Sequence, residues 1–198
     1  MRPRIVVLAS GAGSNLQAIV EACRAGSLPA DVVAVVSNRA DAGALARAAD
    51  AGVPAVHVAL HPGESRTDYD ARLADVVSGF DPHWVVLAGW MRILSMSFLG
   101  WFPGMVVNLH PALPGEFPGT QAIERALAEA KQGLREHTGV MVHLVPDEGV
   151  DSGPVLSTAT VRIDPGDTLE TLAARIHATE HHLLTDTLAA LCRTGAPA

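Results

Sequence analysis

An amide and an imidazole two residues apart are the side chains of this sequence best suited to act together in a reaction. Asn108 and His110 close the short apolar run Met105-Val106-Val107-Asn108-Leu109-His110, which stops at Pro111. Because residues i and i+2 of a strand point to the same side, both polar groups should project together from the end of one strand. Such a pair of donors stabilises an oxygen that gains negative charge, although a polar strand end before a turn would give the same pattern.

A carboxylate that could act with this pair lies in an acid-rich loop, Pro146-Asp147-Glu148-Gly149-Val150-Asp151. Carboxylates in such loops usually belong to solvated turns. The alternative places Asp151 against His110, where it would favour the imidazolium and raise the pKa of the ring. No G-x-S-x-G, HExxH or CxxC motif is present, so direct transfer between two bound substrates is more natural than covalent or metal catalysis.

A glycine-rich turn near the amino terminus is the candidate site for an anion. Gly11-Ala12-Gly13-Ser14-Asn15 follows a strand-like run and opens a helix, so its backbone N–H groups are free to bind phosphate. Leu16 occupies the third glycine position of a dinucleotide fingerprint, and Ser37-Asn38-Arg39 stands where an acid for a ribose diol would be needed. A single phosphate is therefore favoured over NAD, with a tight turn that binds nothing as the other alternative.

A possible site for a flat ring follows the fourth predicted strand, in Ala88-Gly89-Trp90-Met91-Arg92-Ile93-Leu94. Gly89 permits close approach, and Met91, Ile93 and Leu94 could line an apolar slot. Met and Leu at such a joint are more often part of the core, so spacing alone does not decide.

The elements that must position these residues alternate between strand and helix in the first half of the chain. Apolar runs predict strands over 4–9, 32–36, 55–58, 84–88 and 105–109, with intervening helices that end at Gly26 or span 42–51, 65–78 and 95–101. The second half predicts a helix over 119–132, strands over 138–145 and 154–163, and a helix over 168–191 followed by Gly195-Ala196-Pro197. This order predicts an α/β, Rossmann-like three-layer domain, with a mostly parallel twisted sheet of about seven strands, helices on both faces and a mixed carboxyl-terminal part.

Composition limits the possible partners. The 198 residues predict a single domain spanning 1–198, and the formal net charge of −7 argues against binding to nucleic acid or an anionic membrane. Cys23 and Cys192 match no metal spacing, which favours a reducing, cytoplasmic compartment. We expect no signal peptide and no membrane-spanning segment, because the first apolar run is short and no later one is long enough.

Four segments together resemble the glycinamide ribonucleotide transformylase family of folate-dependent formyltransferases. They are SGAGSNLQAI, AGWMRIL, VVNLHPALP and VPDEGVDSGPVL, and they occur in the family's order. The resemblance extends from Ile5 to the final helix. It implies transfer of the formyl group of 10-formyltetrahydrofolate to the amine of 5-phosphoribosylglycinamide in purine biosynthesis, with phosphate bound by about residues 1–100 and catalysis and folate binding in about 101–198.

The resemblance also implies the functions of individual residues. The family's catalytic trio is matched by Asn108, His110 and Asp151. The ribonucleotide would be bound by Gly11, Gly13, Ser14, Asn15, His177 and Glu180. The folate would be bound by Arg66, Met91, Arg92, Ile93, Leu94, Asn108, Asp147, Glu148, Val150 and Asp151. The resemblance implies 10-formyltetrahydrofolate as co-substrate, no metal, small molecules as the only partners, and a monomer or homodimer.

The chain departs from the family around the ribonucleotide pocket. Where the family usually reads PALLPKFPG, residues 111–119 read PALPGEFPG, so that Glu116 replaces a basic residue. Gln121 stands where histidine is common, and Pro146 lies in a loop that is one residue longer than in many relatives. These differences leave the trio intact and bear on the acceptor, so a formyltransferase that acts on another small amine, such as an amino sugar nucleotide, is the alternative.

Other functions are less well supported. Formylation of methionyl-tRNA needs a further basic domain, whereas this acidic sequence ends after its last helix. A nucleotide-binding module without catalysis is an alternative from another class. An NAD-dependent oxidoreductase is disfavoured by Leu16 and Asn38.

Overall fold

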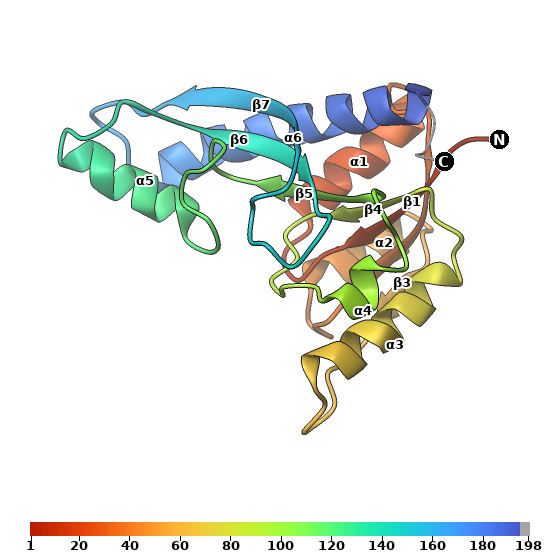
Figure 1. The fold of residues 1–198 in the computed structure, drawn as a ribbon. Helices are drawn as coiled ribbons and strands as arrows, with labels where there is room; N and C mark the ends of the chain where they lie inside the picture. The colour runs from red at the N-terminus through yellow and green to blue at the C-terminus, as the bar shows by residue number, and fades with distance from the viewer. Residues whose placement is uncertain (195–198) are drawn as a thin grey trace.

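A seven-stranded sheet forms the centre of the computed structural model, which describes residues 1–194 (Figure 1). Its strand order is β3-β2-β1-β4-β5-β6-β7. The strands are β1 (Arg4–Leu8), β2 (Asp31–Ser37), β3 (Ala55–His57), β4 (Trp84–Leu87), β5 (Val106–His110), β6 (His137–Leu144) and β7 (Val155–Arg162). The pairings among β1 to β5 are parallel, and β6 runs antiparallel to both β5 and β7. The predicted sheet, with its mixed carboxyl-terminal part, is confirmed.

Helices cover both faces of this sheet, as Figure 1 shows. One face packs against α1 (Ser14–Ala25), α2 (Gly43–Asp50), α5 (Ala122–Lys131) and α6 (Leu169–Thr194), and the other against α3 (Arg66–Ser78) and α4 (Met96–Leu99). Successive residues of β1 explain the three layers: Ile5 and Val7 join the core beneath α1, whereas Val6 and Leu8 join the core beneath α3. A strand buried on both faces shows no alternation of polar residues.

The direction of the strand order reverses at β1. The chain first builds β2 and β3 on one side of β1, and then returns to place β4 and β5 on the other side. In open α/β sheets, such a reversal separates the following loops and leaves a crevice at the carboxyl ends of the strands.

The predicted helix over 119–132 begins later than we expected. The structure places Gly119 (φ 82°) and Gln121 (φ 60°) in the left-handed region, and α5 begins at Ala122. An α-helix cannot include residues with these dihedral angles, so 117–121 forms a turn instead. This turn contacts the candidate site described below.

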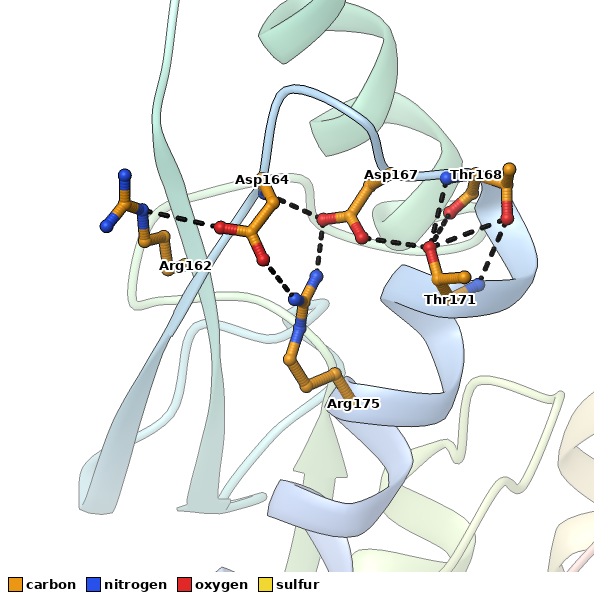
Figure 2. Close-up of polar contacts among 6 residues, drawn as sticks. All are labelled: Arg162, Asp164, Asp167, Thr168, Thr171 and Arg175. Atoms are coloured by element: carbon orange, nitrogen blue, oxygen red, sulfur yellow. Dashed lines mark hydrogen bonds and ion pairs between the residues drawn. The ribbon is translucent and has the colours of Figure 1, made fainter.

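A network of charged side chains ties the end of β7 to the start of α6 (Figure 2). Arg175 pairs with both Asp167 and Asp164, and its Nη1 lies 2.6 Å from a carboxylate oxygen of Asp164. The hydroxyl of Thr168 accepts the N–H of Thr171 at 3.2 Å, which confirms the predicted start of this helix. The segment 195–197 that we expected beyond the helix lies outside the described residues.

The backbone conformation and close packing of Gly13 should make any side chain at this position destabilising. Its φ is +81°, and a Cβ built on it would lie 2.7 Å from the Cα of Ala44 in α2. Gly13→Ala is therefore expected to lower the free energy of unfolding by about 1–3 kcal/mol, measured by urea denaturation. Gly11→Ala is the matched control, because a Cβ there meets nothing within 4 Å. Equal stability of the two variants would contradict the packing argument.

Candidate active site

A cavity of about 670 Å³ opens where the carboxyl ends of β4 and β5 meet the amino end of α1. This is the crevice that the reversal of strand order predicts. Its walls come from segments far apart in sequence, which only the fold brings together. The residues predicted for the site that line it are Ser14, Asn15, Met91, Arg92, Ile93, Leu94, Asn108, His110, Asp147, Glu148, Val150, Asp151, His177 and Glu180.

Asn108, His110 and Asp151 meet at the centre of this cavity wall. One carboxylate oxygen of Asp151 accepts the amide N–H of Asn108 at 3.1 Å, and the other lies 3.3 Å from Nδ1 of His110. The side chains of His110 and Asp151 are only 4% and 11% exposed, so water screens their interaction weakly. Asp151 has a φ of +50°, a conformation that non-glycine residues adopt where the surroundings hold them firmly.

A second histidine, which the sequence analysis did not assign, completes this cluster. His143 lies opposite Asn108 in the β5–β6 pairing, and its Nε2 is 3.0 Å from the Asn108 amide nitrogen. Nδ1 of His143 lies 2.8 Å from the carbonyl of Leu144. With the proton on Nδ1 the ring donates to that carbonyl and Nε2 accepts an N–H of Asn108, whereas with a proton on Nε2 it faces Asp151 as a donor, 3.6 Å away. The ring with its proton on Nδ1 therefore fixes which way the Asn108 amide points.

Backbone groups of the turn before α5 bind the remaining atoms of the trio. Nε2 of His110 lies 3.1 Å from the carbonyl of Phe117, and the N–H of Gly119 donates to Asp151 at 2.8 Å. Both ring nitrogens of His110 thus face acceptors, and only the imidazolium can donate to both at once.

The pKa of His110 is lowered, whereas the sequence led us to expect that Asp151 would raise it. Burial lowers the pKa of the ring below its ordinary value more than Asp151 and the Phe117 carbonyl raise it. For Asp151, burial is again the largest cause and would raise the pKa. The His143 ring, the Gly119 N–H and His110 together outweigh it and lower the pKa of Asp151. The carboxylate is therefore ionised at neutral pH, beside a ring that resists protonation.

The depressed pKa of His110 has a consequence for stability. Below pH 6.5, the ordinary value of the group, the unfolded chain binds a proton that the native ring takes up less readily, so stability should fall as pH drops towards the folded pKa. His110→Gln should reduce the slope of the free energy of unfolding against pH between pH 7.5 and 5, by up to about 1.4 kcal/mol per pH unit. Asp151 affects the curve only in a more acidic range, because its ordinary pKa of 3.8 is lowered further. Urea denaturation across this pH range measures the slope. Equal slopes for the wild-type chain and His110→Gln would show that burial does not lower the pKa of His110.

The amino end of α1 forms one end of the cavity. The amide of Asn15 donates to the carboxylate of Glu180 at 3.1 Å, and burial raises the pKa of Glu180. The carbonyl oxygen of the Asn15 side chain is buried and has no hydrogen-bond partner in residues 1–194. Ser14, Asn15 and His177 line the wall here, whereas Gly11 and Gly13, which we expected to bind the ribonucleotide, do not line it.

The opposite end contains the apolar side chains of residues 91–94 and lies beside an ion pair. Met91 and Ile93 line the wall and are 69% and 48% exposed, so both are accessible to a bound ring. Arg66 does not line the cavity but pairs with Glu148 of the loop between β6 and β7. The other carboxylate oxygen of Glu148 accepts the N–H of Met96 at 3.1 Å, so the loop is tied to the starts of α3 and α4.

Comparison with known proteins assigns the class. Residues 3–188 match the family model described as "Formyl transferase". The chain belongs to the formyl transferase family.

Within this family, the chain is similar to proteins that carry one particular name. The chain is 45% identical to a phosphoribosylglycinamide formyltransferase of Schizosaccharomyces pombe over 192 residues, which cover 91% of this chain and 92% of the relative. It is 42% identical to the Escherichia coli protein of that name over 177 residues, which cover 89% of this chain and 81% of the relative. Among solved structures, glycinamide ribonucleotide transformylase 1 from Symbiobacterium toebii superimposes with a TM-score of 0.91 at 40% identity, covering 98% of this chain and 89% of the other.

Proposed function

We propose that this chain transfers the formyl group of 10-formyltetrahydrofolate to the amine of 5-phosphoribosylglycinamide, a step of purine biosynthesis. The observation that carries the proposal is the meeting of Asn108, His110 and Asp151 on one cavity wall, between a helix amino end and an apolar slot. Relatives with this activity in their names, at 45% and 42% identity, support it.

The two ends of the cavity suit the two substrates. The free N–H groups at the start of α1, beside Ser14 and Asn15, favour a phosphate. The unpartnered carbonyl of Asn15 and the Glu180 carboxylate offer acceptors for the N–H groups of the glycinamide. The slot formed by residues 91–94 and the loop 146–151 suits the flat pteridine ring.

Formyl transfer begins when the substrate amine attacks the formyl carbon. The negative charge that develops on the formyl oxygen needs donors held in place beforehand. One N–H of Asn108 is engaged by His143, and the other reaches Asp151. This second N–H can be shared with the formyl oxygen, because Asp151 keeps Gly119 and His110 as partners. The His110 ring assists by sharing the N–H that faces Asp151 with the oxyanion, and it gains no proton in this step.

Asp151 completes the reaction by moving one proton. The attacking amine must lose a proton after the new C–N bond forms, and the leaving folate nitrogen must gain one when the old C–N bond breaks. The ionised carboxylate of Asp151 accepts the first proton, through a water molecule, and returns it to the folate nitrogen. Atoms and charge balance without a metal or a covalent enzyme intermediate.

A substrate comparison tests this function. With 10-formyltetrahydrofolate held constant, 5-phosphoribosylglycinamide should release tetrahydrofolate rapidly, and amino sugar nucleotides should not. Preference for a sugar nucleotide amine would replace the proposed acceptor by the alternative. Absence of turnover with every amine would favour a binding module without catalysis.

Several broader expectations remain predictions. They are the division of one domain into a phosphate-binding part, about 1–100, and a catalytic and folate-binding part, about 101–198, a monomeric or homodimeric state, and a cytoplasmic location. Within residues 1–194, no helix combines the length and the apolar character needed to cross a membrane.

A further inference from the structure

Outside the cavity, two guanidinium groups lie over one aromatic ring, that of Phe117. Cζ of Arg135 lies 4.4 Å from the centroid of the Phe117 ring, and Cζ of Arg125 lies 5.1 Å from it. The ring is buried, and the backbone of Phe117 has a φ of +45°, which a bulky residue adopts only when its surroundings enforce it. The contacts of the two guanidinium groups with the ring provide such enforcement.

Arg135 is the centre of this arrangement. Its Nη1 lies 2.9 Å from the carboxylate of Glu116, its Nε lies 2.8 Å from that of Glu129, and Nη1 also donates to the carbonyl of His137 at 3.2 Å. The Arg135 side chain is only 17% exposed, so these bonds are better protected from solvent than an ordinary surface pair. A planar guanidinium can hold two carboxylates and a ring face together, which an ammonium cannot do.

The turn that carries Phe117, residues 116–119, is the one that contacts the catalytic trio. Phe117 supplies the carbonyl that faces His110, and Gly119 supplies the N–H that binds Asp151. The chain therefore links Arg135 to His110 through the Phe117 ring and backbone, although Arg135 itself does not line the cavity.

We propose that Arg135 is a positioning residue for formyl transfer, which holds the 116–119 turn so that the Phe117 carbonyl stays against His110 and the Gly119 N–H stays against Asp151. The inference rests on the proposed function of the trio. Glu116 occupies a position where the resembled family usually has a basic residue, and a basic residue there would repel Arg135. The acidic residue at 116, which departs from the family pattern, is therefore explained by its bond to Arg135.

The sharpest readout is the pKa of the His110 ring, measured by NMR titration of the full chain without substrates. Arg135→Gln removes a positive charge, and that loss alone would raise the pKa of a nearby histidine. Loss of the Phe117 carbonyl would instead lower it, because this carbonyl helps to hold the proton on the ring. Asp151 and His143, the charged or titratable groups that face His110, remain in the variant. We expect a downward shift, and an unchanged or raised pKa would overturn the proposal.

Kinetics give the second readout. Arg135→Gln should lower kcat about tenfold or more and leave the KM of both substrates within about twofold, because small misplacements of catalytic groups mainly affect the chemical step. Arg135→Lys should recover part of kcat through its charge. If Arg135→Gln does not fold, Arg135→Lys, which keeps the charge but not the planar set of bonds to Glu116 and Glu129, should show the same downward pKa shift to a smaller extent, and no shift would count against the proposal.

Arg175→Gln is the matched control, because Arg175 also joins two carboxylates but contacts neither Phe117 nor the trio (Figure 2). It should lower stability and leave the pKa of His110 unchanged. An equal pKa shift in this control would show that the shift in Arg135→Gln results from general destabilisation and not from the 116–119 turn. Failure of the wild-type chain to transfer formyl groups would refute the proposed function, whereas an unmoved His110 pKa in Arg135→Gln would refute only this inference.

Discussion

Replacing either donor of the trio should reduce turnover by about a hundred- to thousandfold, since removing a single oxyanion donor has cost about 3–4 kcal/mol in comparable sites. Asn108→Ala removes the N–H that is offered to the formyl oxygen, and His110→Ala removes the ring beside it. Both side chains lie on the cavity wall, and the effect is expected in kcat. Steady-state release of tetrahydrofolate measures the effect.

His61→Ala is the control for these variants, because His61 is an exposed histidine that does not line the cavity. Its turnover should match that of the wild-type chain. Near-normal turnover by His110→Ala would refute the assignment of this ring to the oxyanion.

Asp151→Asn should reduce kcat by about a hundred- to ten-thousandfold, the range typical for loss of a general acid–base group. The substitution keeps the shape of the side chain but removes its charge and its ability to carry a proton. It also leaves an NH2 group facing either the Asn108 amide nitrogen or the Gly119 N–H, so that a donor meets a donor.

The matched control for this variant is Asp186→Asn, an exposed carboxylate of α6 that does not line the cavity. It should have no effect on turnover. If Asp151→Asn retained more than a tenth of wild-type kcat, proton transfer would have to run through another group.

The sequence alone allowed the pairing of Asn108 with His110 to be predicted, because the period of a strand is a local property. The partnership with Asp151 was one of two alternatives from the residues and became specific only through the family resemblance, since Asp151 lies 41 positions after His110. His143 was missed for a related reason. Its contact with Asn108 follows from the register of the antiparallel β5–β6 pair, and no local pattern specifies that register.

The turn before α5 and the pKa of His110 could not be predicted for different physical reasons. Phe117 and Gln121 adopt left-handed conformations that their side chains disfavour, so local propensity extended the helix to 119. The pKa of His110 depends on how deeply the ring is buried, and burial becomes known only once the loop 146–151 and the turn are in place. Both errors concern tertiary contacts that override a local preference.

The most direct test of the central claim follows the formyl carbon itself. The wild-type chain is mixed with 10-formyltetrahydrofolate labelled with ¹³C in the formyl group and with 5-phosphoribosylglycinamide, and NMR records where the label goes. We predict that the label moves entirely to the glycinamide nitrogen, that no free formate accumulates, and that Asp151→Asn nearly abolishes this transfer. Appearance of the label as formate, or equal transfer by Asp151→Asn, would contradict direct transfer by this trio.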